Sequence, residues 1–184
     1  MEKIAKLEGP TPQQRLEWDG VPKGKKIAAG FLKGDGDLGG VQATEEALRR
    51  YVVRGAVEVF AANVQLAKSP ALEAALQKSV EGLKIVLKGA PKLDDLLGRI
   101  KYVTDQHRTY GDQQRQQAFT QLKQQFQAQV QQAMQRQGQQ ANRAVNVETM
   151  PEFQAEWMRV RAQLDGQFEE HMDEFRQQLK ALAK

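Results

Sequence analysis

Residues 149–182 read TMPEFQAEWMRVRAQLDGQFEEHMDEFRQQLKAL, and this stretch decides the predicted fold. Large apolar side chains recur in it every three or four positions, which is the spacing of one face of an α-helix. The opening Thr149-Met150-Pro151-Glu152 has the pattern of a capping box, in which the threonine and glutamate side chains satisfy free backbone amides. We therefore predict a long helix with one apolar stripe, formed by Phe153, Trp157, Val160, Leu164, Phe168, His171, Phe175, Leu179 and Leu182.

The segment before this helix carries a second long helical pattern that starts after Pro91. Gly111 divides the pattern, either as the end of one helix or as a soft point within a longer one. Apolar residues resume the same spacing at Phe119 and Leu122, so we expect a continuous or mildly kinked helix. The short connection over residues 142–149 then favours an antiparallel, coiled-coil-like hairpin over residues 91–184.

Two shorter helices are predicted within residues 41–90. The first runs from about Ala43 to Lys68 with a broad apolar face, which is typical of a central helix in a bundle. Gly55 in its middle is costly in a helix and indicates the close approach of another helix. The second begins with Ser69 as its N-cap and ends near Gly89.

Residues 1–40 are rich in glycine and proline, a density of helix breakers that predicts a loop-rich N-terminal arm. Disorder of this arm is the competing interpretation. Ordered docking is favoured because Trp18 and Phe31 would otherwise be large exposed aromatic residues. The predicted fold class is therefore all-α: a helical bundle with a long antiparallel hairpin in the C-terminal half, preceded by this arm.

Composition narrows the functional classes. The chain has 184 residues and no cysteine, which excludes disulfides and thiolate ligands. No apolar run approaches the length of about 18 residues that a membrane-spanning helix requires, so no membrane partner is expected. The N-terminus lacks the apolar core of a secretory signal, and the expected location is the cytoplasm.

The net charge is only +4, and its distribution is more informative than its size. Residues 113–147 carry Arg115, Lys123, Arg136 and Arg143 without any acid, whereas the last helix has an acidic run that we interpret as a solvated face: Asp165, Glu169, Glu170, Asp173 and Glu174. The N-terminal arm has its own basic cluster, which predicts phosphate contacts in an alternative role as a nucleic-acid- or ribosome-associated protein: Lys23, Lys25, Lys26 and Lys33.

Motifs for chemistry are weak throughout the sequence. Residues 20–26 fail the spacing of a phosphate-binding loop, and residues 35–46 fail that of a calcium loop. The two histidines, His107 and His171, fall on apolar helix faces and are expected to be buried, hydrogen-bonded core residues. The sequence thus predicts no catalytic residue, no metal ligand and no cofactor, and we expect a protein that is not an enzyme.

About half of residues 113–140 are glutamine, which favours the solvated side of a long helix whose apolar stripe must be covered. A second copy of the hairpin or a partner's helix would cover it, so a homo-oligomer or a protein partner is expected. The leading hypothesis is an adaptor or scaffold protein. Ligand binding inside the bundle around Phe60 is a third hypothesis without a specific motif. The predicted interaction seam consists of Phe119, Leu122, Phe126, Trp157, Leu164, Phe168 and Phe175.

Overall fold

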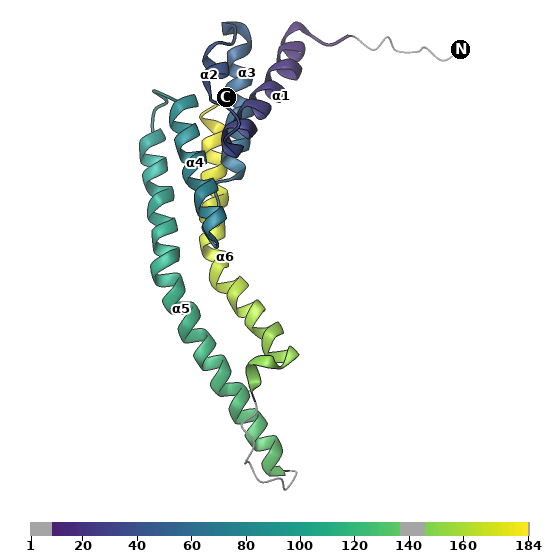
Figure 1. The fold of residues 1–184 in the computed structure, drawn as a ribbon, viewed down its shortest axis with the longest axis vertical. Helices are drawn as coiled ribbons and strands as arrows, with labels where there is room; N and C mark the ends of the chain where they lie inside the picture. Colours follow the sequence, from purple (N-terminus) through teal and green to yellow (C-terminus); the bar gives the residue numbers. More distant parts are fainter. Residues whose placement is uncertain (1–8, 137–145, 184) are drawn as a thin grey trace, which may run out of the picture. The chain divides into compact units, whose positions relative to one another are not determined.

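The structure is a computed structural model that describes residues 9–136 and 146–183. All regular elements of this described part are helices, which confirms the all-α class. In chain order they are α1 (Pro12–Lys33), α2 (Gly39–Gln42), α3 (Glu46–Ala62), α4 (Pro70–Val86), α5 (Leu93–Arg136), the short 3₁₀ helix η1 (Val147–Thr149) and α6 (Pro151–Ala181) (Figure 1).

The chain divides into two compact units. Unit 1 comprises the chain up to Ile100 together with the residues from Met172 onward, and unit 2 comprises Lys101–His171. The predicted N-terminal arm and the predicted two-helix segment therefore belong to the same unit. Each long helix of unit 1 contributes side chains that are at most 1% exposed to its core, among them Ala28, Val52, Val57, Phe60, Leu83, Ile100, Met172 and Leu179.

The prediction of a loop-rich arm over residues 1–40 is wrong, because α1 occupies 22 residues of it. The helix begins with a capping box: the amide of Gln14 donates to Oγ1 of Thr11, and Oε1 of Gln14 accepts from the amide of Thr11. It ends at Gly34, whose φ of 85° provides the left-handed C-cap that favours glycine. Pro22 lies inside the helix. The glycines, which suggested loops, instead allow close packing against α3.

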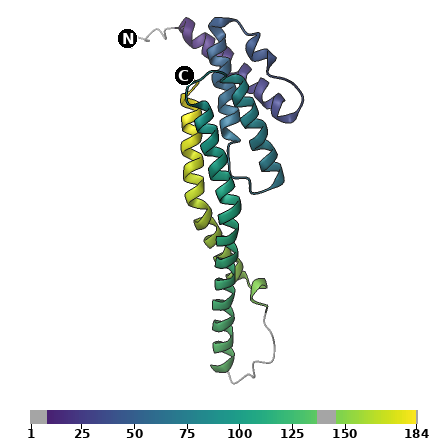
Figure 2. The same ribbon diagram turned by 90° about the vertical axis from the view of Figure 1, so that its left-hand side faces the viewer.

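Glycines allow α1 and α3 to pack with their backbones in contact, and both views show α1 lying against α3 (Figures 1 and 2). A Cβ atom on Gly24 would lie 1.9 Å from the carbonyl oxygen of Val52, and one on Gly55 would lie 2.1 Å from that of Val21. Any side chain there would therefore force the two helices apart. This confirms the prediction that Gly55 marks the close approach of another helix.

The two large aromatic residues of the N-terminal segment, Trp18 and Phe31, differ in their surroundings. The Phe31 ring packs edge-to-face against the ring of Phe60, with centroids 5.9 Å apart. Trp18 is 62% exposed, so the expectation that its burial would anchor the segment is wrong. The close helix contact through glycine, rather than tryptophan burial, holds α1 in place.

The helices α3 and α4 differ from their predicted ranges mainly at one end. α3 stops at Ala62 rather than Lys68, and Nδ2 of Asn63 donates to the Val59 carbonyl at 2.9 Å. The chain beyond it still contributes buried side chains, which produced the apolar pattern that we interpreted as more helix: Val64 and Leu66. The predicted start of α4 is confirmed, because the Leu72 amide donates to Oγ of Ser69.

Gly111 does not interrupt α5, which runs for 44 residues without a break (Figure 2). The expected continuity of this helix is therefore confirmed.

The predicted capping box at the start of the last helix is wrong. Thr149 belongs to η1 and its hydroxyl donates to the carbonyl of Asn146 at 2.9 Å, so it does not cap α6, which begins at Pro151. Part of the predicted connection, including Arg143, lies outside the described residues.

Candidate functional site in the helical hairpin

Within unit 2, α5 and α6 pack against each other in opposite directions. Phe119 of α5 contacts Phe153 at the start of α6, with ring centroids 5.5 Å apart. His107, earlier in α5, contacts Phe168, later in α6, with centroids 5.2 Å apart. As the residue number rises along one helix it falls along the other, and this order brings together side chains that the sequence separates by about 35 to 60 positions.

An aromatic cluster lies at the end of unit 2 where the two helices are joined. Phe119 packs edge-to-face on Trp157, and Phe126 packs in the same way on Phe153. The cluster has three buried members, namely Leu122, Val147 and Phe153. Five others are only partly buried: Phe119, Phe126, Val130, Met150 and Trp157. Part of this apolar surface therefore stays exposed within the described residues.

The predicted seam residues are not all brought together. Phe119, Leu122, Phe126 and Trp157 share the aromatic cluster. Phe168 is half-buried against His107 further along the hairpin, and Leu164 is also half-buried. Phe175 belongs to unit 1, where it is 2% exposed and lies under the guanidinium of Arg99. The seam is thus an internal contact of the hairpin in unit 2, and Phe175 is a core residue of unit 1.

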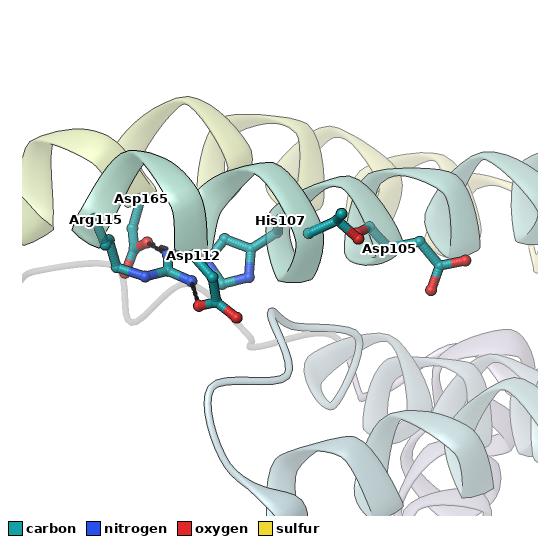
Figure 3. A network of polar contacts seen from close by, with 6 residues as sticks. Asp105, His107, Asp112, Arg115 and Asp165 are labelled. Carbon is teal, nitrogen blue, oxygen red and sulfur yellow. Dashed lines mark hydrogen bonds and ion pairs between the residues drawn. The ribbon is translucent and has the colours of Figure 1, made fainter. Parts of the chain in front are cut away.

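A buried polar network crosses the hairpin near its middle, shown in Figure 3. Nη1 of Arg115 donates to Oδ1 of Asp165 at 2.8 Å, and Nε2 of His107 lies 3.0 Å from the same oxygen. His107 is 4% and Asp165 7% exposed. Nη2 of Arg115 donates at 2.5 Å to Asp112, which is 69% exposed, so one arginine joins a buried and an exposed carboxylate.

Nε2 of His107 has two hydrogen-bonding neighbours, an acceptor on Asp165 and a donor on Arg115. If Nε2 carries the proton it donates to Asp165, and if it does not it accepts from Nη1 of Arg115, 3.0 Å away. Both arrangements satisfy a buried polar atom, which is the structural role that burial requires. Because His107 and Asp165 are both enclosed between the helices, a substrate has no access to the pair. We interpret the network as a device that fixes the register of α5 against α6.

Sequence reasoning placed one member of this network correctly and one wrongly. His107 is the buried, hydrogen-bonded histidine that was predicted. Asp165 was assigned to a solvated acidic face, and this is wrong because its carboxylate is buried against Arg115. The sequence does contain a signal for the α5 members of this network, which is their spacing. His107, Gly111 and Arg115 recur every four residues and therefore lie on one face of α5.

The second histidine prediction is also wrong, because His171 is exposed. The buried stripe of α6 passes instead through Met172, which is 0% exposed. Steps of four, four and three residues connect Leu164, Phe168, Met172 and Phe175. A methionine and a histidine stand side by side at this turn, and the apolar one takes the core position.

The four lysines predicted to contact phosphate all lie on the helix α1. Nζ of Lys25 pairs with Oε2 of Glu58 at 2.8 Å. Lys23, Lys26 and Lys33 are exposed. Positions 23, 26 and 33 recur at three and seven residues, so these three lysines share one side of α1 while Lys25 faces α3. The structure therefore separates the predicted cluster into three exposed cations and one that is paired.

No group of three or more His, Cys, Asp or Glu side chains in the described part of the chain is arranged to hold a metal ion. None of the helices within the described ranges combines the length and apolarity needed to cross a membrane.

The chain belongs to a family of unknown function (DUF6657), whose model matches residues 39–181. The matched region begins after α1 and includes the whole of unit 2. Neither the curated proteins nor the solved structures contain a match to the chain. A functional assignment therefore depends on the geometry of the described residues.

Proposed function

We propose that this protein is a non-enzymatic helical assembly protein that associates with a second copy of itself through the hairpin of unit 2. The observation that supports this proposal is the incomplete burial of the aromatic cluster. Five of its members keep part of their surface exposed: four lie on α5 and α6, and Met150 directly precedes α6. Covering apolar surface is favourable by about 25 cal/mol per Å², and two further helices from a second hairpin would complete a four-helix bundle.

The surroundings of the cluster support the same proposal. Met158 directly follows Trp157 in α6 and is 71% exposed, so α6 carries a further apolar side chain that faces solvent. Lys123 follows Leu122 and Glu148 follows Val147, and the two side chains pair at 2.5 Å, so these two charges beside the cluster neutralise each other. Partly exposed aromatic side chains beside an exposed methionine are typical of a protein interface.

The experiment must separate association from folding, because the same aromatic residues hold the hairpin together. Met158→Glu changes a side chain that is mostly exposed, so α6 should retain its helix while the apolar surface gains a charge. We expect light scattering to give about twice the 20.7 kDa chain mass for the wild-type protein and the single-chain mass for Met158→Glu. Far-UV circular dichroism should be equal for both proteins.

Gln125→Glu is the matched control, since it introduces the same charge on an exposed position of α5. It should leave the dimer mass unchanged. A single-chain mass for the wild-type protein at all concentrations, or equal dissociation by both variants, would contradict association through the hairpin.

A second candidate function is association with nucleic acid or the ribosome through α1. It is favoured by the shared exposure of Lys23, Lys26 and Lys33, for which the described residues provide no carboxylate partner. A salt titration of RNA binding tests it, because phosphate contacts weaken steeply between about 50 and 200 mM salt. Absence of binding at low salt, or binding that persists in Lys23→Gln/Lys26→Gln, would contradict this role.

A further inference from the structure

Unit 1 contains a cleft of about 490 Å³ whose lining residues all belong to this unit. It is lined by α1, α3, the last turns of α6 and Ala183, which follows α6. This volume lies within the range of about 300–1,000 Å³ that is usual for small-molecule sites. The lining residues are Gln13, Glu17, Arg50, Tyr51, Arg54, Glu58, Gln177, Lys180 and Ala183.

The charges around the cleft do not cancel. Both acids are already engaged by Arg54, whose Nη1 lies 2.8 Å from Glu17 and whose Nε lies 3.5 Å from Glu58. Glu58 also receives Lys25 at 2.8 Å. Among the described residues, this leaves Arg50 and Lys180 as the lining cations that have no carboxylate partner.

Arg50 is held in position by the residue that follows it. Its guanidinium lies 4.5 Å from the centroid of the Tyr51 ring, and its Nη2 donates to the Tyr51 hydroxyl at 2.5 Å. Tyr51 is 5% exposed, so the ring that supports the guanidinium is fixed in the core of unit 1. The remaining N–H groups of Arg50 are free to form paired hydrogen bonds with an oxyanion.

We propose that this cleft binds a small anionic molecule through its phosphate or carboxylate group, with Arg50 and Lys180 as the anion-binding residues. Arg50 supplies a planar pair of donors, and Lys180 supplies a second positive charge from α6. Glu17 and Glu58 hold Arg54 at the side of the cleft and limit the site to two available cations. This site is separate from the hairpin surface and does not depend on the proposed self-association.

Isothermal titration calorimetry on the full chain tests the proposal with two probes, inorganic pyrophosphate and citrate, which distinguish a phosphate from a carboxylate ligand. We expect saturable binding of at least one probe with one site per chain. Arg50→Gln and Lys180→Gln should each weaken it about tenfold, the size expected for one lost charge-assisted hydrogen bond. Tyr51→Phe should weaken it less, because it removes only the hydroxyl that positions Arg50.

Lys84→Gln is the matched control, because it removes an exposed positive charge from α4 that does not line the cleft. It should leave binding unchanged, as should Met158→Glu in unit 2. Circular dichroism of each variant establishes that the fold is retained. The proposal is overturned if neither probe binds saturably, or if Lys84→Gln weakens binding as much as Arg50→Gln.

Discussion

At the scale of single residues, the glycines of α1 differ sharply in what surrounds them. A Cβ on Gly24 would collide with the α3 backbone, whereas one on Gly30, six positions later, would meet nothing within 4 Å. We expect Gly24→Ala to destabilise the fold by about 1–3 kcal/mol through overpacking. Gly30→Ala should stabilise it by about 0.5–1 kcal/mol, because alanine is the better helix former. Urea unfolding followed by circular dichroism measures both, and equal effects would contradict the backbone contact.

The two carboxylates bound to Arg115 provide a second residue-scale prediction. Asp165→Ala leaves a largely buried arginine and a buried histidine without their shared partner, and we expect a loss of about 2–4 kcal/mol. Asp112→Ala removes an exposed partner of the same arginine and should cost less than about 1 kcal/mol. Thermal unfolding of the two variants measures the difference. Similar losses for both would show that the buried position contributes nothing special.

Asp105 leads to a prediction about pH. Its carboxylate accepts a hydrogen bond from Lys101 at 2.6 Å and another from Arg108, and the Lys101 hydrogen bond above all lowers the pKa of Asp105. A lowered pKa in the folded state stabilises the fold above the unfolded-state pKa, and the stabilisation disappears as the pH falls through the folded-state pKa. The side chain is 39% exposed, so Asp105→Asn should cost less than about 1 kcal/mol at pH 7.

The measurement for Asp105 is urea unfolding of the wild-type protein and Asp105→Asn at several pH values. Their difference should be constant near neutral pH and vanish under acidic conditions, and added salt should reduce it. A difference that grows on acidification would have the wrong sign and would contradict the ion-pair explanation.

At the scale of elements, two threonines compare a real helix cap with an apparent one. Thr11 accepts the amide hydrogen bond that begins α1, and Thr11→Ala should cost about 1 kcal/mol. Thr149 donates to a carbonyl within η1 and caps no α-helix, so Thr149→Ala should cost less. Unfolding free energies measure the comparison. A larger loss at Thr149 would mean that it caps α6 in solution.

The sequence predicted a helix well where one face of it is apolar and packs on the core while the opposite face is polar and faces solvent. The long α5 and the start of α4 at Ser69 followed from spacing and cap chemistry that act within a few residues. The sequence did not predict α1, because the rule that glycine and proline break helices considers only what each residue costs the helix that contains it. Gly20, Gly24 and Ala28 recur every four residues and are buried, so they form a small-residue stripe that α3 covers.

The candidate site shows the same division between local and distant causes. The prediction that His107 is buried rests on its own helix, in which it lies on the apolar face. Asp165 could not be placed correctly in the same way, because its burial depends on Arg115, which lies 50 positions away and arrives from the other helix. The packing between helices determines which residues pair with a buried charge. The periodicity of a single helix contains no information about that packing.

At the scale of the whole molecule, the two units differ in how much apolar surface they enclose. In the described part of unit 2, the buried hydrophobic residues are Leu122, Val147 and Phe153, and all the others belong to unit 1. Since burial of apolar surface is the main stabilising contribution, we expect unit 2 to unfold at a lower urea concentration than unit 1. The two tryptophans report on this separately, because Trp18 lies in unit 1 and Trp157 in unit 2.

The measurement uses Trp18→Phe, which leaves Trp157 as the reporter, and Trp157→Phe, which leaves Trp18. If a second hairpin covers the aromatic cluster, association stabilises the folded state of unit 2, and the Trp157 midpoint should rise with protein concentration. The Trp18 midpoint should change less, because the core of unit 1 is complete within one chain. Coincident transitions that are independent of concentration would show that the chain unfolds as one unit and that the hairpin needs no second copy.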